Sequence, residues 1–180
     1  MPSHAPERIV IRSGVLCPSV FHEVAMKPLF ALAVSIALLV ALWVYVSIGL
    51  PSLQLIPWIG FVAWATFFAA GGGRAAIVQS LPPAIAGVLL TALTMFGVAN
   101  AGGGLSALIV LVAVLAFVLV AMASHKALAY TPAAFLGAAS YFGSGGKVDE
   151  SILFVVASWV VGVAFGYASE RMGVKLTRTA

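Results

Sequence analysis

The chain has 180 residues, of which 63% are hydrophobic and 8% are charged, and its mean hydropathy is +1.16. A water-soluble domain of this size and composition would have a largely apolar surface, so the sequence predicts an integral membrane protein whose surroundings are a lipid bilayer. The net charge of +4 comes from too few residues to indicate nucleic acid as a partner. The single cysteine, Cys17, excludes an intrachain disulfide and a cysteine-based metal cluster.

Residues 1–26 are polar and mixed, have no helical or strand period, and are expected to form a loose N-terminal tail. Met26 directly precedes the first apolar run and is an alternative native start, in which case residues 1–25 are an upstream extension. The apolar run itself is too long for the core of a signal peptide and predicts a retained membrane span.

Six apolar segments follow, separated by short stretches that carry glycine, proline or charge. They lie at about residues 29–49, 54–71, 75–99, 105–124, 127–143 and 152–169, and a short basic tail follows at 173–180. A helix that crosses a bilayer needs about 20 apolar residues, so the second and fifth segments are at the short end. We therefore predict an all-α membrane domain over residues 27–172 with six transmembrane helices, of which the second and fifth are short or broken.

The basic residues favour full crossings by all six segments. With a cytoplasmic N-terminus, six crossings place eight of the nine basic residues inside and only Lys147 outside, beside Asp149 and Glu150. If the second and fifth segments were re-entrant loops, Arg74 and Lys126 would move outside, leaving six of nine inside. The positive-inside rule thus predicts that both termini are cytoplasmic.

Residues 61–72 and 135–146 are similar at a constant offset of 74, without a gap. Five pairs are identical: Phe61/Phe135, Ala65/Ala139, Phe68/Phe142, Gly71/Gly145 and Gly72/Gly146. Chance is the alternative explanation, because Ala, Gly and Phe are common in this chain. Since the predicted topology runs the two copies in opposite directions, the six helices would form an inverted 3+3 repeat, in which solute paths often lie at the repeat interface.

Asp, Glu, Lys and Arg are absent from the six predicted spans. Ion pumps and proton relays place ionisable groups within the membrane, so this absence favours a passive route for a small neutral solute, or no transport role. The sequence shows no catalytic triad, carboxylate pair or metal-ligand pattern, and we expect neither an enzyme nor a bound cofactor or metal.

Ten residues are candidates for lining a pore or binding the solute, because aromatic rings can form a narrow slot beside hydrogen-bonding groups. They are Phe61, Thr66, Phe67, Phe68, Gln79, Thr131, Phe135, Ser140, Tyr141 and Phe142. Thr66 and Ser140 are the preferred hydroxyls, since the repeat makes them equivalent. The alternatives are structural: hydroxyls bonded within their own helix, rings that face lipid, and a helix contact for Gln79.

Two blocks around the repeat carry a family resemblance: Trp58-x-x-Phe61 with Phe67-Phe68-Ala-x-Gly-Gly, and Tyr130-Thr-Pro-x-x-Phe135-x-Gly-Ala-x-x-Tyr-Phe-Gly143. Over about residues 29–170 the chain resembles the bacterial inner-membrane family known as domain of unknown function 1097, which implies an inner-membrane location and no particular activity. Tyr130-Thr-Pro-Ala-Ala-Phe135 is also similar to a pore-helix signature of urea transporters, without its leading leucine-proline. That similarity implies Thr131 and Phe135 as pore residues.

The leading hypothesis is a channel or facilitator for a small, urea- or amide-like neutral solute. One alternative is a non-transporting membrane subunit with an assembly or regulatory role, and another is a carrier coupled to an ion through backbone carbonyls at the broken spans. Because 180 residues are few for a pore, we expect a homo-oligomer.

Overall fold

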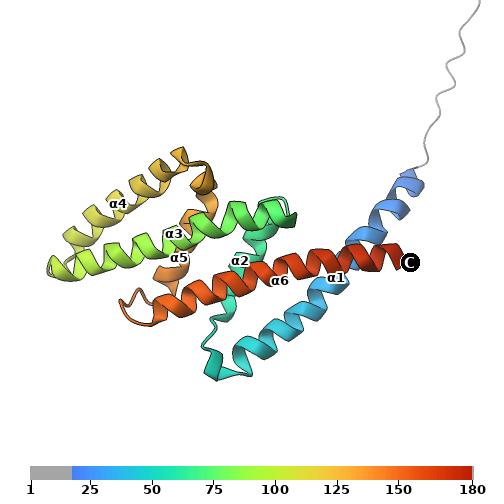
Figure 1. Ribbon diagram of the computed structural model, residues 1–180, viewed down its shortest axis with the longest axis horizontal. Coiled ribbons are helices and arrows are strands. Elements are labelled where there is room, and N and C mark those ends of the chain that lie inside the picture. Colours follow the sequence, from blue (N-terminus) through green and yellow to red (C-terminus); the bar gives the residue numbers. More distant parts are fainter. Residues whose placement is uncertain (1–17, 180) are drawn as a thin grey trace, which may run out of the picture.

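The computed structural model describes the backbone of residues 18–179 and the side chains of residues 28–177, and all regular structure in this range is helical. Figure 1 shows α1 (Pro18–Ile48), α2 (Pro57–Ala69), α3 (Gly73–Asn100), α4 (Leu105–Ala121), α5 (Thr131–Gly143) and α6 (Ser151–Thr179). The short 3-10 helices η1 (Pro51–Leu53), η2 (Met122–Ser124) and η3 (Lys126–Leu128) lie in the connections. Helix α1 begins ahead of the predicted first span, and most of the predicted N-terminal tail, residues 1–26, lies outside the described residues.

The prediction of an all-helical membrane protein is confirmed. Four helical segments are long and apolar enough to cross a bilayer: Pro28–Ile48, Gly73–Asn100, Leu105–Ser124 and Ser151–Thr177. Helices α2 and α5 have 13 residues each, which corresponds to about 20 Å of helix against the roughly 30 Å of a hydrocarbon core. The two short helices therefore stand where the two short segments were predicted, and length alone does not make either of them a span.

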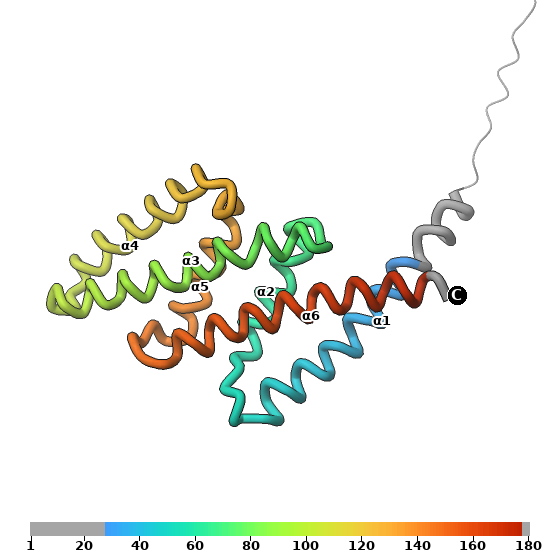
Figure 2. Tube along the Cα trace, in the orientation of Figure 1, coloured from blue at the N-terminus to red at the C-terminus, as the bar shows by residue number. Residues whose placement is uncertain are grey.

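The two short helices cross the long ones in a reciprocal pattern. Helix α2 packs mainly on α6, whereas α5 packs mainly on α3, and α3 and α6 contact each other at the centre. Helix α1 lies along α6 and α4 lies along α3, so that each long central helix has one outer neighbour. The Cα trace in Figure 2 shows α2 running across α6 and α5 running across α3. Contacts between α2 and α5 themselves are sparse.

Glycines allow the crossing helices to approach until their backbones touch. A Cβ atom on Gly162 of α6 would lie 2.5 Å from the Gly60 carbonyl oxygen of α2. On the other side of the molecule, a Cβ on Gly137 of α5 would overlap the Ala84 carbonyl oxygen of α3. Small residues at helix crossings let the backbones pack closely, and this packing stabilises helix association in lipid, where the hydrophobic driving force is missing. The core is thus held by close van der Waals contact.

The connections lie at two opposite edges of the molecule. In Figure 1 the loops after α1, α3 and α5 lie along the left and lower edge, while the turns after α2 and α4 lie along the upper and right edge, with the C-terminal end of α6. Side-chain contacts agree, since Gln54 shares a pocket with residues 149–151, and the Gly73 amide binds Glu170. Successive helices therefore run between the same two edges in alternating directions.

Candidate functional site

Helices α2 and α5 begin and end in the same way. Each has a proline at one of its first two positions, Pro57 and Pro132, where the missing N–H has no helical partner to lose. Each ends in a pair of glycines with positive φ, 93° and 73° in α2 and 104° and 61° in α5. The second glycine donates its N–H to the backbone carbonyl oxygen five positions earlier, Gly72 to Phe67 at 3.2 Å and Gly146 to Tyr141 at 3.1 Å. The Gly-Gly pairs thus form the same helix-ending motif twice.

The two helices are also buried in the same pattern. At fourteen of the sixteen aligned positions, from 57/131 to 72/146, the paired residues are buried, half-buried or exposed alike. The exceptions are Val62/Leu136 and Phe68/Phe142, where the first member is half-buried and the second exposed. The sequence repeat therefore corresponds to two structurally equivalent helices.

The identical aromatic residues of the repeat lie on the outer faces of these helices. Phe61 is 42% exposed, Phe135 41% and Phe142 37%, and Phe68 is half-buried. Phe135 and Phe142 line an apolar groove of about 180 Å³ between α5 and α4, together with Leu115 and Leu119. These candidate rings are thus not gathered in the core between α2 and α5, and within the single chain they face outward.

The other matched candidates form the buried faces. Phe67 and Tyr141 are fully buried, and the Tyr141 hydroxyl donates to the Lys147 carbonyl oxygen at 2.7 Å. Thr66 Oγ1 donates to the Val62 carbonyl oxygen and Ser140 Oγ to that of Leu136, both at 2.7 Å. Each hydroxyl therefore donates its hydrogen bond within its own helix, and its oxygen can still accept one from another group.

Ser140 already uses this acceptor. The indole nitrogen Nε1 of Trp159 in α6 donates to Ser140 Oγ at 3.0 Å, and both residues are fully buried. Trp64 Nε1 makes a similar bond to Ser169 Oγ at 3.1 Å. The sequence repeat singled out Ser140 but gave no signal for its tryptophan partner.

The last two candidates lie apart from the buried faces. Gln79 is exposed on α3, and Thr131 is half-buried at the first residue of α5. The structure therefore brings Thr66, Phe67, Ser140 and Tyr141 into the protein interior, and it leaves Gln79 at the surface.

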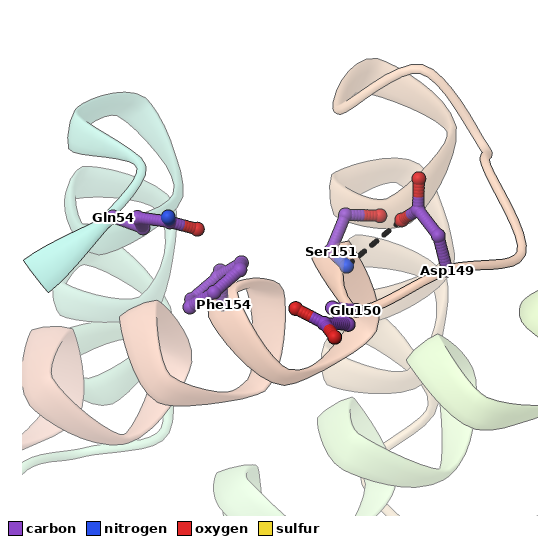
Figure 3. Close-up of a pocket in the computed structure, with 5 residues that line it drawn as sticks. All are labelled: Gln54, Asp149, Glu150, Ser151 and Phe154. Atoms are coloured by element: carbon purple, nitrogen blue, oxygen red, sulfur yellow. Dashed lines mark hydrogen bonds between the residues drawn. The ribbon is translucent and has the colours of Figure 1, made fainter.

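A polar pocket that the sequence did not predict lies between the loops after α1 and α5. Figure 3 shows its lining residues, Gln54, Asp149, Glu150, Ser151 and Phe154, around a space of about 500 Å³. The Ser151 N–H donates to Asp149 Oδ1 at 2.8 Å, and this hydrogen bond lowers the pKa of the Asp149 carboxyl. The pocket lies between connections at the edge of the molecule opposite to the turn between α2 and α3.

Metal binding has no obvious site among the described residues, where no group of three or more His, Cys, Asp and Glu side chains is placed to hold an ion. The buried hydroxyls and the outward-facing rings offer hydrogen bonding and apolar contact.

Comparison with known proteins gives one family and several relatives. The model of the family described as protein of unknown function (DUF1097) matches residues 33–174. The uncharacterized protein YahC of Escherichia coli K12 is 31% identical over 162 residues, which covers 85% of this chain and 98% of that protein. The inner membrane protein YcdZ is 28% identical over 152 residues in both E. coli K12 and Salmonella typhimurium LT2, covering 84% of this chain and 89% or 91% of those proteins. No solved structure matches the chain.

Proposed function

This chain belongs to the DUF1097 family, and we propose that it is an inner-membrane channel or facilitator for a small uncharged solute. The inner-membrane location follows the name of its relative YcdZ, an inner membrane protein, and the four apolar helices long enough to cross a bilayer. The observation that carries the transport proposal is the equivalence of α2 and α5 in ends and burial pattern.

The proposed architecture is a six-helix inverted 3+3 repeat with both termini in the cytoplasm. The alternating direction of successive helices between two edges supports it, as does the exchange of partners, α2 on α6 and α5 on α3. Helices α2 and α5 would cross with the help of flanking non-helical residues, which a membrane tolerates where protein surrounds them. Arg74, Lys126 and Arg171 would then lie on the cytoplasmic side, and Lys147 outside.

The buried hydroxyls suggest which solutes would be accepted. Eight serine and threonine side chains are buried in the described region, and all eight donate to backbone carbonyls: Ser35, Ser47, Thr66, Ser80, Thr91, Ser140, Ser158 and Ser169. Such groups can offer a solute only acceptor lone pairs. A solute with N–H donors, such as urea or a short amide, suits them better than one that has only acceptors.

The proposed route follows the seam between α2 and α5, where direct contacts are sparse. Thr66 is the residue we expect to meet the solute there. It is buried, its proton is bonded to Val62, and no described side chain donates to its oxygen. Exposed apolar side chains on the outer faces of α2 and α5 favour assembly of several copies, and we propose a homo-oligomer.

The experiment is stopped-flow shrinkage of proteoliposomes with urea, acetamide and glycerol. We expect urea and acetamide permeability above that of empty liposomes, and a severalfold loss of it in Thr66→Val. Thr177→Val is the matched control, because Thr177 also donates to its own helix but lies exposed near the end of α6. Permeability equal to that of empty liposomes for all three solutes would rule out the proposal.

A second candidate function is a membrane subunit without transport activity, with an assembly or regulatory role. The backbone contacts at Gly137 and Gly162 favour it, because they close the α3–α5 and α2–α6 interfaces tightly. Recovery of one stoichiometric partner protein on purification, together with impermeable proteoliposomes, would support this alternative.

A further inference from the structure

Two arginines from different helices share one tyrosine at the upper and right edge of the molecule. Arg171 Nε donates to the Tyr167 hydroxyl at 3.0 Å, and its guanidinium carbon lies 5.1 Å from the centre of the Tyr167 ring. Arg74, in the first turn of α3, lies close enough to interact with the same Tyr167 side chain, since the N–H of the preceding residue, Gly73, binds Glu170 beside Arg171. Both arginine residues are exposed. Tyr167 thus lies near both guanidinium groups and is bonded to that of Arg171.

The glycine turn before α3 fixes this arrangement. The Gly73 N–H donates to Glu170 Oε2 at 2.8 Å, which ties the start of α3 to the end of α6. The other Glu170 oxygen lies so close to Gly72 that a Cβ there would be 2.7 Å away. Glu170 therefore directs its carboxylate at the backbone of the turn. Lys175, one helical turn after Arg171, adds a third cationic residue to the Arg74 and Arg171 region of the chain.

We propose that Arg74 and Arg171 bind the phosphate of an anionic phospholipid headgroup. A guanidinium group presents planar paired donors that match phosphate oxygens, and two of them beside one phenol can reach the same phosphate. The ligand is assigned to a lipid because α3 and α6 are both long enough to span the bilayer. Val78, one turn further into α3 than Arg74, is 68% exposed and offers an acyl chain an apolar contact.

This inference does not depend on solute transport, because it concerns the ends of two candidate spans and not the α2–α5 seam. Basic residues near a membrane surface each contribute about fivefold to the binding of anionic lipid at moderate ionic strength. The paired geometry makes the preference specific to this edge.

The test is native mass spectrometry of the full chain, purified in neutral detergent and incubated with phosphatidylglycerol or phosphatidylcholine. We expect the protein to retain phosphatidylglycerol in preference to phosphatidylcholine, and the double variant Arg74→Gln/Arg171→Gln to lose at least about fivefold of that retention. Lys147→Gln, a cation at the opposite edge, is the matched control and should bind as the unmodified protein does. Equal retention of phosphatidylglycerol by the double variant would overturn the proposal.

Hydrogen exchange of the unmodified protein gives a measurement that does not depend on how the variant folds. Phosphatidylglycerol, and not phosphatidylcholine, should slow amide exchange in residues 73–75 and 167–175. Slowing confined to other segments would contradict the site. If inorganic phosphate at the same concentration slowed exchange in residues 73–75 and 167–175, the ligand would be a soluble phosphate and the lipid assignment would be rejected.

Discussion

At the scale of single residues, the crossing of α3 and α5 depends on two glycines, Gly87 and Gly137, because they have no side chain. Gly87 faces the carbonyl oxygen of Ala134, and Gly137 faces that of Ala84, so neither helix has room for a Cβ atom on the other. The obstructing atoms belong to the backbone and cannot rotate away. The interface therefore tolerates substitution much less than an interface between side chains does.

Gly137→Ala is expected to lower the free energy of unfolding by about 1–3 kcal/mol, because α5 must move away from α3 to accommodate the methyl group. Gly104→Ala is the matched control: Gly104 has negative φ, −77°, and its nearest non-neighbouring atom to a Cβ is the Ser106 hydroxyl at 4.0 Å. Thermal unfolding in detergent, followed by circular dichroism, compares the two. An unchanged midpoint for Gly137→Ala would show that the close approach does not exist.

Ser140 donates a hydrogen bond within its own helix, and its oxygen also accepts one from the Trp159 indole. Replacing Ser140 with alanine leaves the buried Trp159 N–H without its acceptor, and a buried donor without a partner costs about 1–3 kcal/mol. Ser80 is equally buried and bonds the Ala76 carbonyl oxygen at 2.7 Å, but no described side chain donates to it. We expect Ser140→Ala to lower the unfolding midpoint more than Ser80→Ala does. Equal shifts would show that the indole bond contributes no stability.

At the scale of elements, the short helices were predictable because their ends carry local signals. Pro57 and Pro132 mark the starts, and the Gly-Gly pairs after α2 and α5 mark the ends. These signals act through the backbone of neighbouring residues, so they can be read without the fold. The predicted segments 54–71 and 127–143 contain both helices with only a few residues to spare.

The inner faces of α2 and α5 were not predictable in the same way. The identical residues of the repeat, such as Phe61 and Phe135, lie on the outer faces, whereas the inner pairs differ, as Trp64 and Ala138 do. Each inner face packs against a different long helix. The residues of that face are therefore determined by the shape of the partner helix and not by the repeat. Trp64, for example, bonds Ser169, 105 positions away in the chain. Partners this distant leave no trace in a local pattern.

The start of α6 is expected to depend on pH through Asp149. Its hydrogen bonds from Ser151 hold the pKa of the Asp149 carboxyl below its usual value of 3.8. A lowered pKa in the folded state means that the stabilisation is complete above 3.8 and is lost as pH falls through the lower folded value. Exchange of the Ser151 amide, measured by NMR between pH 2 and 6, should therefore become faster relative to neighbouring amides at the acidic end.

Asp149→Asn is the control for this titration, because its amide oxygen accepts the same hydrogen bond without titrating. The relative exchange rate at Ser151 should then be independent of pH over the same range. An equally steep acid dependence in Asp149→Asn would assign the effect to a group other than Asp149.

At the scale of the whole molecule, charge and connectivity agree. Arg74 lies in the first turn of α3, directly after the turn that ends α2, and Lys126 lies in the connection after α4. Both connections lie at the edge that holds the C-terminal end of α6. The loop after α5 carries Lys147, Asp149 and Glu150 at the opposite edge. The sequence predicted this segregation by counting charges alone. The sequence could not predict that the 13-residue helices α2 and α5 lie across the long helices, because this arrangement arises from packing.

Cysteine accessibility distinguishes six crossings from four. In a Cys17→Ser background, the inverted repeat places Ser52 and Gly102 outside and Ser124 inside. Cysteines at these positions should therefore react with a membrane-impermeant maleimide in intact spheroplasts at 52 and 102, and at 124 only after lysis. If α2 and α5 instead return to the side from which they enter, 102 becomes inaccessible and 124 reactive. Position 52 is outside in both arrangements and controls for labelling, so the other two decide whether the short helices cross.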